Sequence, residues 1–161
     1  MHMLKVLFVC TGNICRSPMA EAVFRQIVSQ AGLTDEIQVD SAGTSDEEVG
    51  NTTHRGTLKV LSKHQIPHDS HRYARQITLA DTREFDYLLT MDKGHLSRVQ
   101  PMLRGSKTTV ALFLSYAFQA GTVKTEEVLD PWYTGHFDET YDLVVKGCQA
   151  FLDYLRSTHG L

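Results

Sequence analysis

Short apolar runs alternate with amphipathic stretches along the 161 residues of this chain. Four mostly apolar runs predict buried strands, at residues 4–9, 37–41, 87–90 and 108–112. Four stretches with apolar residues three or four positions apart predict helices, at residues 18–32, 57–63, 92–99 and 139–157. Strands that alternate with helices favour a parallel sheet. We therefore expect an α/β fold, a three-layer αβα sandwich around a central four-stranded parallel sheet.

The last predicted helix has the most regular pattern. A continuous apolar stripe runs along it, made of Tyr141, Val144, Val145, Cys148, Phe151, Leu152 and Leu155. Gly160 follows the stripe and suits the end of a helix. By contrast, segments 47–78 and 115–133 are polar and predict mainly loops.

Composition narrows the class of protein. A chain of 161 residues and 18.1 kDa suits one domain, over residues 1–161. The net charge of −3 and the pI of about 6.2 give no basic surface for nucleic acid, and no apolar run is long enough to insert into a membrane. Three cysteines, an odd number, argue against a disulfide framework. We expect a cytoplasmic protein, and its oligomeric state stays open.

The most informative segment is the loop between the first predicted strand and the first predicted helix. Residues 10–18 read Cys-Thr-Gly-Asn-Ile-Cys-Arg-Ser-Pro, and Pro18 suits a first helical turn because it lacks an N–H donor. Backbone N–H groups and the helix dipole at such a place attract an oxyanion. The same field, together with Arg16, favours the thiolate form of Cys10. A thiolate and a guanidinium that face one phosphate make a site for phosphate transfer.

The spacing of Cys10 and Arg16 suits a tetrahedral anion. The residues between them let the backbone curl so that up to about six N–H groups point inward, while Arg16 binds two phosphate oxygens. Gly12 permits a positive φ in this curl, and Asn13 is the next most tolerant residue. Ser17 can donate a hydrogen bond to the Cys10 sulfur. The alternative is an ordinary strand-to-helix turn with an inert thiol, and the combination of strand, helix and loop residues argues against it.

With these residues the chain resembles a known family, the low-molecular-weight protein tyrosine phosphatases. Their loop has the pattern Cys-x-Gly-Asn-x-Cys-Arg-Ser-Pro at the extreme N-terminus, as here. Further matching segments follow in the family's order, at residues 40–44, 74–77, 85–87, 91–92 and 130–133. The resemblance implies that the chain hydrolyses phosphotyrosine in its partner proteins, and small aryl phosphates, through a phosphocysteine intermediate. It also implies a phosphate-binding and supporting role for Thr11, Gly12, Asn13, Ile14, Cys15 and Ser17.

Catalysis by a cysteine also needs an acid for the leaving phenolate, and Asp130 is the candidate. Pro131 follows it, stiffens the loop and biases Asp130 toward an extended conformation. Trp132 and Tyr133 come next and offer two aromatic faces for a flat ring. The alternative is a simple Asp-Pro turn beside surface aromatics. The resemblance favours the catalytic interpretation, because the family has its general acid at this aspartate.

Other polar residues are expected to support the loop. By resemblance, a hydrogen-bond network holds the loop open, and its members are Asn13, Ser17, Ser41 and His71. Asp92 would pair with Arg16 and hold its side chain in place. An alternative role for Asp92 is the N-cap of the following helix, and the two roles are compatible.

The other histidines and cysteines can be considered as metal ligands and as redox partners. His64, His68 and His71 are close in sequence, but Pro67 interrupts them, so we expect no metal and no cofactor. Cys15 shares the loop with Cys10. A sulfenic acid on Cys10 could therefore be trapped as a Cys10–Cys15 disulfide, which predicts redox regulation. The alternative is that Cys15 only packs beneath the loop, while Cys148 is expected to be a buried small apolar residue.

Three other functions fit parts of the sequence. Arsenate reductases of the same fold need a further redox pair of cysteines, which this chain lacks. The protein-arginine phosphatase branch carries Thr where this chain has Ile14, and a branched apolar side chain suits an aryl phosphate better than a guanidinium. A non-catalytic phosphotyrosine-binding module would lack Cys10, Arg16 or Asp130, and all three are present.

One position departs from the family pattern. Alignment places Glu47 where an aromatic or bulky apolar residue usually walls the mouth of the site, and Glu48 follows. Either the mouth has one aromatic wall, from Trp132 and Tyr133, or another residue replaces the missing one.

Overall fold

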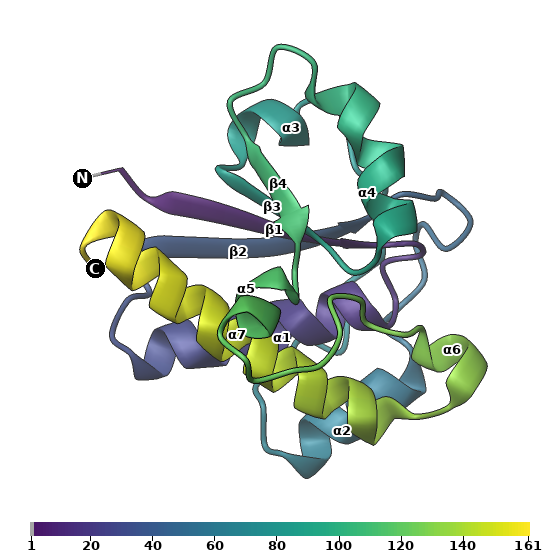
Figure 1. Ribbon diagram of the computed structural model, residues 1–161. Coiled ribbons are helices and arrows are strands. Elements are labelled where there is room, and N and C mark those ends of the chain that lie inside the picture. Colours follow the sequence, from purple (N-terminus) through teal and green to yellow (C-terminus); the bar gives the residue numbers. More distant parts are fainter. Residues whose placement is uncertain (1) are drawn as a thin grey trace.

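The computed structural model describes residues 2–161 and contains one parallel sheet (Figure 1). Its strands are β1 (Leu4–Cys10), β2 (Ile37–Gly43), β3 (Tyr87–Thr90) and β4 (Thr109–Leu112). They lie in the order β2-β1-β3-β4, and every neighbouring pair is parallel. The prediction of a four-stranded parallel sheet is therefore confirmed, with the ends of each strand shifted by at most two residues.

Seven α-helices and one 3-10 helix connect and follow the strands in the described part of the chain. They are α1 (Arg16–Gln30), α2 (Arg55–Lys63), α3 (Asp81–Glu84), α4 (Lys93–Val99), η1 (Gln100–Leu103), α5 (Ser115–Gln119), α6 (Pro131–Thr134) and α7 (Phe137–His159). The predicted helices correspond to α1, α2, α4 and α7. The sequence analysis missed α3, α5, α6 and η1, because elements of four or five residues are too short to show a helical period.

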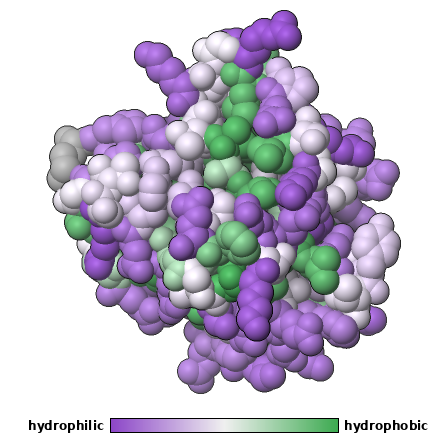
Figure 2. Space-filling view, viewed as in Figure 1, coloured by the Kyte–Doolittle hydropathy of each residue, from purple (hydrophilic) through white to green (hydrophobic). Residues whose placement is uncertain are grey.

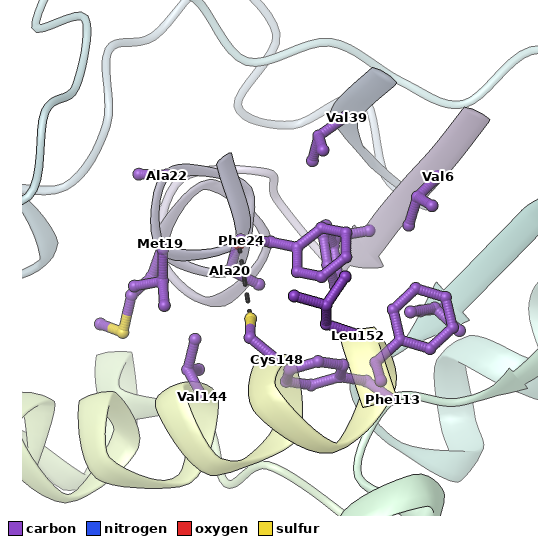
Figure 3. Close-up of a cluster of buried hydrophobic side chains, with 14 of the residues drawn as sticks. Val6, Met19, Ala20, Ala22, Phe24, Val39, Phe113, Val144, Cys148 and Leu152 are labelled. Atoms are coloured by element: carbon purple, nitrogen blue, oxygen red, sulfur yellow. Dashed lines mark hydrogen bonds between the residues drawn. The ribbon is translucent and has the colours of Figure 1, made fainter. Parts of the chain in front are cut away.

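The larger core lies between the sheet and the helices α1, α2, α5 and α7. Its aromatic centre includes Phe8, with ring centroids 5.7 Å from Phe24 and 5.3 Å from Phe113. Figure 3 shows Cys148 of α7 pointing toward α1, with its sulfur 3.9 Å from the Ala20 carbonyl oxygen. The expected buried, apolar placement of Cys148 is what the structure shows.

A smaller core lies on the opposite face of the sheet, beneath α3 and α4 (Figure 1). Along β1, Val6 and Phe8 face the larger core while Leu7 and Val9 face the smaller one. Both faces of β1 are thus covered, which explains its uninterrupted apolar sequence. β4 is an edge strand, and Figure 2 shows hydrophobic residues gathered over β4 and α5 on the face in view.

The strands deliver several polar segments to one edge of the molecule. Parallel strands end together, so the segments after β1, β2 and β3 meet at the carboxyl edge of the sheet. The segments after β1 and β2 are packed tightly, because a Cβ at Gly43 would stand 2.6 Å from the Thr11 carbonyl oxygen. Only glycine fits there without moving the loop. Among the described residues, no helix is both long and apolar enough to cross a membrane.

Candidate active site

The phosphate loop, residues 10–16, runs from the last residue of β1 to the first residue of α1. Cys10 and Arg16 are both buried, and Cys10 Sγ lies 2.9 Å from Ser17 Oγ. Ser17 Oγ also accepts a hydrogen bond of 2.8 Å from Asn13 Nδ2, so its own hydrogen is free to point at the sulfur. Cys10 Sγ thus lies beside a hydroxyl donor, and the loop that it begins ends at the N-terminus of the 15-residue helix α1.

The positive φ of the loop belongs to Asn13. Asn13 has φ 60°, whereas Gly12 is not among the positive-φ residues of the chain. The sequence analysis gave this conformation first to Gly12, and the structure corrects that assignment. Asparagine tolerates the left-handed region because its side chain can hydrogen-bond locally. Gly12 instead leaves room for a neighbour, since a Cβ there would stand 3.0 Å from Glu48 Cγ.

Asn13 is the centre of the network that supports the loop. Its Nδ2 donates to Ser17 Oγ and, over 2.9 Å, to Ser41 Oγ. Its Oδ1 accepts from Arg72 Nη2 over 2.6 Å and from the Arg75 backbone N–H over 3.0 Å. The amide of a fully buried residue is therefore satisfied on both sides, which fixes the curl of the loop before any ligand arrives.

The prediction that His71 belongs to this network is wrong. His71 is exposed, and its recorded hydrogen bond runs from its backbone N–H to Asp69. The neighbouring Arg72 takes the place, with Nη1 donating to the Asn13 carbonyl oxygen over 3.1 Å and Nη2 to Asn13 Oδ1. The predicted position is wrong by one residue. It lies in a loop, where neither the alternation of a strand nor the period of a helix indicates which side chain faces the site. An arginine there adds charge-assisted hydrogen bonds to the back of the loop.

A buried carboxylate closes the network on its far side. Ser41 Oγ donates to Glu21 Oε1 over 2.6 Å, and Glu21 pairs with Arg25 over 2.5 Å. Ser41 and Glu21 are both buried. The sequence analysis found Ser41 but missed Glu21, which lies on a helix whose apolar face gave no sign of a polar partner.

Arg16 is held by the loop after β3 and by the segment before α6. Its Nη1 donates to Asp92 Oδ2 over 3.0 Å and to the Val128 carbonyl oxygen over 2.9 Å. Its Nη2 lies 3.4 Å from Asp130 Oδ2. The expected contact between Asp92 and Arg16 is present.

Asp92 is also the N-cap of α4, because its Oδ1 accepts from the His95 backbone N–H over 2.9 Å. The two roles considered for Asp92 therefore occur together, one on each carboxylate oxygen. Burial disfavours the charge, but hydrogen bonds from His95 and Arg16 outweigh it and hold the pKa of Asp92 below its usual value.

Asp130 stands at the entrance to the site. It caps α6 by accepting from the Trp132 backbone N–H over 3.1 Å, and its other oxygen is the one near Arg16. Pro131 occupies the first helical position of α6, where its missing N–H leaves no donor without a partner. A cavity of about 170 Å³ opens here, lined by Cys10, Thr11, Gly12, Ile14, Cys15, Arg16, Ser45, Glu47, Glu48, Asp130, Trp132 and Tyr133. Nucleophile, guanidinium and carboxyl group thus face one space, although they lie far apart in sequence.

Comparisons with known proteins agree with this geometry. The model of the family described as "Low molecular weight phosphotyrosine protein phosphatase" matches residues 5–159. The chain belongs to this family. YfkJ of Bacillus subtilis, named a low molecular weight protein-tyrosine-phosphatase, is 39% identical over 151 residues, which are 93% of this chain and 94% of that protein. PtpA of Staphylococcus aureus, with the same family name, is 37% identical over 95% of this chain and 94% of that protein.

Solved structures of similar proteins have the same fold. The crystal structure of YfkJ gives a TM-score of 0.91 at 37% identity and covers 98% of both chains. A Drosophila arginine phosphatase gives a TM-score of 0.85 at 31% identity and covers 95% of this chain and 98% of that one. Family membership and the αβα fold expected from the resemblance are therefore confirmed.

Two aromatic residues of α6 line the mouth of this family member's site. Trp132 and Tyr133 are 54% and 84% exposed. The Trp132 ring rests edge-on against His54, with centroids 5.4 Å apart, and His54 stacks on Phe137. The His54 backbone N–H also donates to the Ile14 carbonyl oxygen over 2.8 Å. His54 thus connects the phosphate loop to the aromatic wall, a role that no local pattern indicated.

The acidic residues of the segment after β2 line the same mouth. Glu47 is exposed, and Glu48 is partly covered and accepts a hydrogen bond from Asn51 Nδ2 over 2.6 Å. Both line the cavity, and the aromatic lining residues come only from α6. Of the two arrangements considered for the mouth, the structure has the one with a single aromatic contributor.

Cys15 is a buried residue of the loop at the N-cap position of α1, and it also lines the cavity. Burial and the neighbouring Cys10 raise the pKa of the Cys15 thiol to about 12. Burial likewise raises the pKa of the Cys148 thiol on α7. Cys15 is thus protonated near neutral pH, so its proposed reaction with an oxidised Cys10 is slower than that of an ordinary thiol.

The histidines close in sequence lie in different surroundings. Residues 2–161 contain no group of three or more His, Cys, Asp or Glu side chains arranged to hold a metal ion. His64, His68 and His71 are all exposed, and His64 stacks on Tyr141 with ring centroids 4.0 Å apart. The three histidines have separate surroundings and do not form a site.

The remaining residue that the sequence analysis missed is His95. It is buried in the first turn of α4, and its Nε2 lies 2.8 Å from Thr11 Oγ1. The two residues are 84 positions apart, so only the fold brings them together. His95 is close to Asp92 in sequence, but a histidine in the first turn of a helix does not by itself indicate a functional role.

Proposed function

We propose that this family member is a protein tyrosine phosphatase that hydrolyses phosphotyrosine in proteins, and small aryl phosphates, through a phosphocysteine intermediate. The observation that carries the proposal is that Cys10, Arg16 and Asp130 line one cavity. A nucleophile, an anion receptor and a proton donor are the three groups that hydrolysis of an aryl phosphate needs.

In the first step the Cys10 thiolate attacks phosphorus. A bond forms between Sγ and phosphorus while the bond from phosphorus to the phenolic oxygen breaks. Asp130, protonated at the start, gives its proton to that oxygen, so a neutral tyrosine leaves. The loop N–H groups and Arg16 stabilise the charge on the three oxygens of the phosphoryl group while it is being transferred.

In the second step Asp130, now ionised, accepts a proton from water. The water oxygen attacks phosphorus, and the bond between phosphorus and Sγ breaks. Inorganic phosphate leaves, and Cys10 returns as a thiolate. Ser17 assists both steps because its hydroxyl, 2.9 Å from Sγ, stabilises the thiolate as attacking and as leaving group.

The lining of the cavity supports an aryl substrate. Ile14 is apolar and lines the cavity, and the exposed faces of Trp132 and Tyr133 stand at its mouth. A phosphoarginine substrate would place a charged guanidinium against Ile14, which offers no hydrogen-bond acceptor from its side chain. The structural similarity to an arginine phosphatase therefore makes phosphoarginine peptides the necessary comparison, and we expect phosphotyrosine peptides to be preferred.

The remaining alternatives are less well supported. Cys148 is the one cysteine outside the loop, and it is fully buried on α7. The chain therefore has no further pair of cysteines through which it could reduce arsenate. The proposed nucleophile and acid line the same cavity, and this arrangement argues against a non-catalytic binding module. Since the proposed nucleophile must stay reduced, we assign the protein to the reducing cytoplasm.

Substitution of Cys10 and Asp130 tests the proposal. Cys10→Ser should abolish turnover with an unchanged fold by circular dichroism. Asp130→Ala should slow aryl phosphates with poor leaving groups by about two to four orders of magnitude, and those with good leaving groups far less, because only the former need the proton. The measurement is kcat/KM across a series of leaving-group pKa values. An equal loss across the series would remove Asp130 from the role of acid.

The same assay decides the substrate class. Matched peptides that carry phosphotyrosine or phosphoarginine at one position are compared by kcat/KM. Preference for phosphoarginine would overturn the assignment to tyrosine while leaving the phosphatase chemistry in place. Absence of turnover on both would favour the binding module.

A further inference from the structure

His95 joins both ends of the phosphate loop to α4. Its Nε2 lies 2.8 Å from Thr11 Oγ1 and 3.4 Å from Arg16 Nη2. Thr11 directly follows Cys10, and Arg16 ends the loop. The His95 side chain is buried and is not one of the cavity-lining residues, so it stands behind the wall of the site. One imidazole therefore contacts the loop at its beginning and at its end.

The direction of these hydrogen bonds follows from the partners. A guanidinium only donates, so a hydrogen bond from Arg16 requires Nε2 to be an acceptor and the ring proton to reside on Nδ1. Thr11 can donate its hydroxyl hydrogen to the same nitrogen, and its shorter distance makes it the stronger contact. Nδ1 lies 3.3 Å from Asp92 Oδ1 but makes no hydrogen bond, so the carboxylate favours a ring proton on Nδ1 through its charge alone.

The surroundings of His95 keep its ring neutral. Burial and the positive charge of Arg16 lower its pKa to about 4, although Asp92 and Asp130 oppose the shift. A protonated ring would carry a hydrogen on Nε2 and would point it at Arg16. The neutral ring is therefore the form present near neutral pH, and with its proton on Nδ1 it leaves Nε2 as an acceptor.

The hydrogens of Arg16 show what this acceptor does. The guanidinium has five N–H donors, and the two on Nη1 face Asp92 and the Val128 carbonyl oxygen. His95 takes one hydrogen of Nη2. The donors without a hydrogen bond are Nε–H and the second hydrogen of Nη2, and this edge can bind two phosphate oxygens side by side; Asp130 Oδ2 lies 3.4 Å from the same Nη2.

We propose that His95 is a positioning residue for phosphate transfer: its neutral ring accepts hydrogen bonds from Thr11 and Arg16 and so fixes loop and guanidinium in the geometry that receives the phosphoryl group. This role rests on the proposed function, in which Arg16 binds the substrate phosphate. His95 acts through Thr11 and Arg16 and does not touch the substrate itself.

The test compares an acceptor-free variant with an acceptor-retaining one. His95→Leu fills similar space without a hydrogen-bond acceptor, whereas His95→Gln offers an amide oxygen. His159→Leu is the matched control, because His159 Nε2 and the Tyr87 hydroxyl form the same kind of pair, 2.8 Å apart, away from the loop. The measurements are kcat and KM on para-nitrophenyl phosphate and the inhibition constant of inorganic phosphate.

We expect His95→Leu to lower kcat/KM by about tenfold and to raise both KM and the phosphate inhibition constant, because Arg16 contacts phosphate in the bound and the transition state. His95→Gln should stay within about threefold of wild type, and His159→Leu should not differ from wild type. A purely structural role would lower kcat by reducing the amount of folded enzyme and would leave KM and the inhibition constant unchanged. That result, or equal losses in His95→Leu and His95→Gln, would overturn the proposal.

Thr11→Val separates the two contacts. We expect a loss of about threefold, and the double variant Thr11→Val/His95→Leu should be no worse than His95→Leu alone, because both substitutions remove the same hydrogen bond. Fully additive losses would contradict the proposed connection between the two residues.

A spectroscopic measurement on the wild-type protein keeps the proposal testable if His95→Leu does not fold. Nitrogen NMR of the histidine rings should show His95 neutral near pH 7 with its proton on Nδ1, and a proton on Nε2 would overturn the proposal. Wild-type protein without any turnover of aryl phosphate would contradict the proposed function itself. Active wild-type protein with an unaffected His95→Leu variant would contradict only the role of His95.

Discussion

The floor and the rim of the active-site cavity are built in different ways. The floor, which we define as Cys10, Asn13, Arg16 and Ser17, is at most 3% exposed. Segments from across the chain fix it, namely Ser41, Arg72, Arg75, Asp92 and Val128. The rim, which we define as Glu47, Trp132 and Tyr133, is exposed.

This difference separates chemistry from specificity. A floor with its hydrogen bonds already made binds the phosphoryl group, which every substrate of the enzyme shares, at little cost in reorganisation. A rim with few fixed contacts meets the variable part of the substrate. Changes in the floor should therefore affect all substrates alike, and changes in the rim should alter the preference between them.

The largest effect is expected for Arg72, which holds the back of the floor. Arg72→Met leaves the buried Asn13 carbonyl oxygen and Oδ1 without these donors, which costs on the order of 1–3 kcal/mol. We expect about a tenfold fall in kcat/KM that is equal for small aryl phosphates and for peptides. His71→Ala, one residue away, should change neither activity nor stability. A strong effect of His71→Ala, or a loss in Arg72→Met that depends on the substrate, would break the distinction between floor and rim.

The next effect is a pH dependence of stability caused by His95. The unfolded ring titrates near 6.5 and the folded ring near 4, so the unfolded state binds more protons between these values. Stability should fall as pH drops through this window, by about 2–3 kcal/mol in total. The charged groups that face His95 are Arg16, Asp92, Asp130 and Arg98.

The measurement is urea unfolding of wild type and His95→Gln from pH 7 to pH 4.5. The free energy of unfolding of His95→Gln should lose the dependence on pH that His95 causes. His68→Gln, at an exposed position, should keep that dependence. Carboxylates that lose their charge near pH 4 act in all three proteins and cancel in the difference. Parallel stability curves for wild type and His95→Gln would contradict the lowered pKa.

A smaller effect concerns recovery from oxidation. Peroxide converts the Cys10 thiolate to a sulfenic acid, and attack by Cys15 would form a disulfide and release water. Cys15→Ser should therefore recover less than half of the activity that dithiothreitol restores to wild type, and Cys148→Ala should recover as wild type does. Because the pKa of Cys15 is raised to about 12, the protection should be greater at pH 9 than at pH 7. Full recovery of Cys15→Ser would exclude the disulfide.

The smallest effect belongs to the rim. Glu47 and Glu48 at an anion site repel acidic residues that flank a phosphotyrosine and attract basic ones. An exposed contact of this kind contributes about 0.2–1 kcal/mol, enough for a few-fold preference for peptides with Lys or Arg, and more so at low salt. Glu47→Trp should weaken the preference and bind aryl substrates more tightly.

The measurement for the rim is kcat/KM on matched acidic and basic peptides at two ionic strengths. Preference of wild type for acidic peptides, or no change in Glu47→Trp, would show that Glu47 does not act on the substrate. The turnover of para-nitrophenyl phosphate, which has no flanking residues, serves as the control and should keep its salt dependence in both proteins.

Much of the fold and the centre of the site could be predicted from the sequence. Strands buried on both faces, such as β1, give uninterrupted apolar runs, and long helices such as α7 show their period clearly. The loop from Cys10 to Arg16 could be recognised because its residues are adjacent in sequence and each has a chemical reason for its place.

The missed features depend on contacts that only the folded chain makes. His95 reaches Thr11, and Arg72 replaces the expected His71, through loops whose register no periodicity fixes. The conformation assigned to Gly12 belongs to Asn13 because the amide of Asn13 finds four partners. Sequence patterns thus led to the proposed catalytic residues and to the supporting residues Asn13, Ser17, Ser41 and Asp92, but not to Glu21, Arg72 or His95.

The two oxygens of Asp92 have a consequence for the lifetime of the active state. One oxygen holds the His95 amide at the start of α4, and the other holds Arg16. Fraying of that first helical turn therefore removes the hydrogen bond from Arg16 to Asp92 and leaves Arg16 with its bond to the Val128 carbonyl oxygen. The exchange of the His95 amide with deuterated solvent would record how often the arginine loses this support, without any substrate present. The enzyme's readiness to react is in this sense a local folding equilibrium of one helical turn.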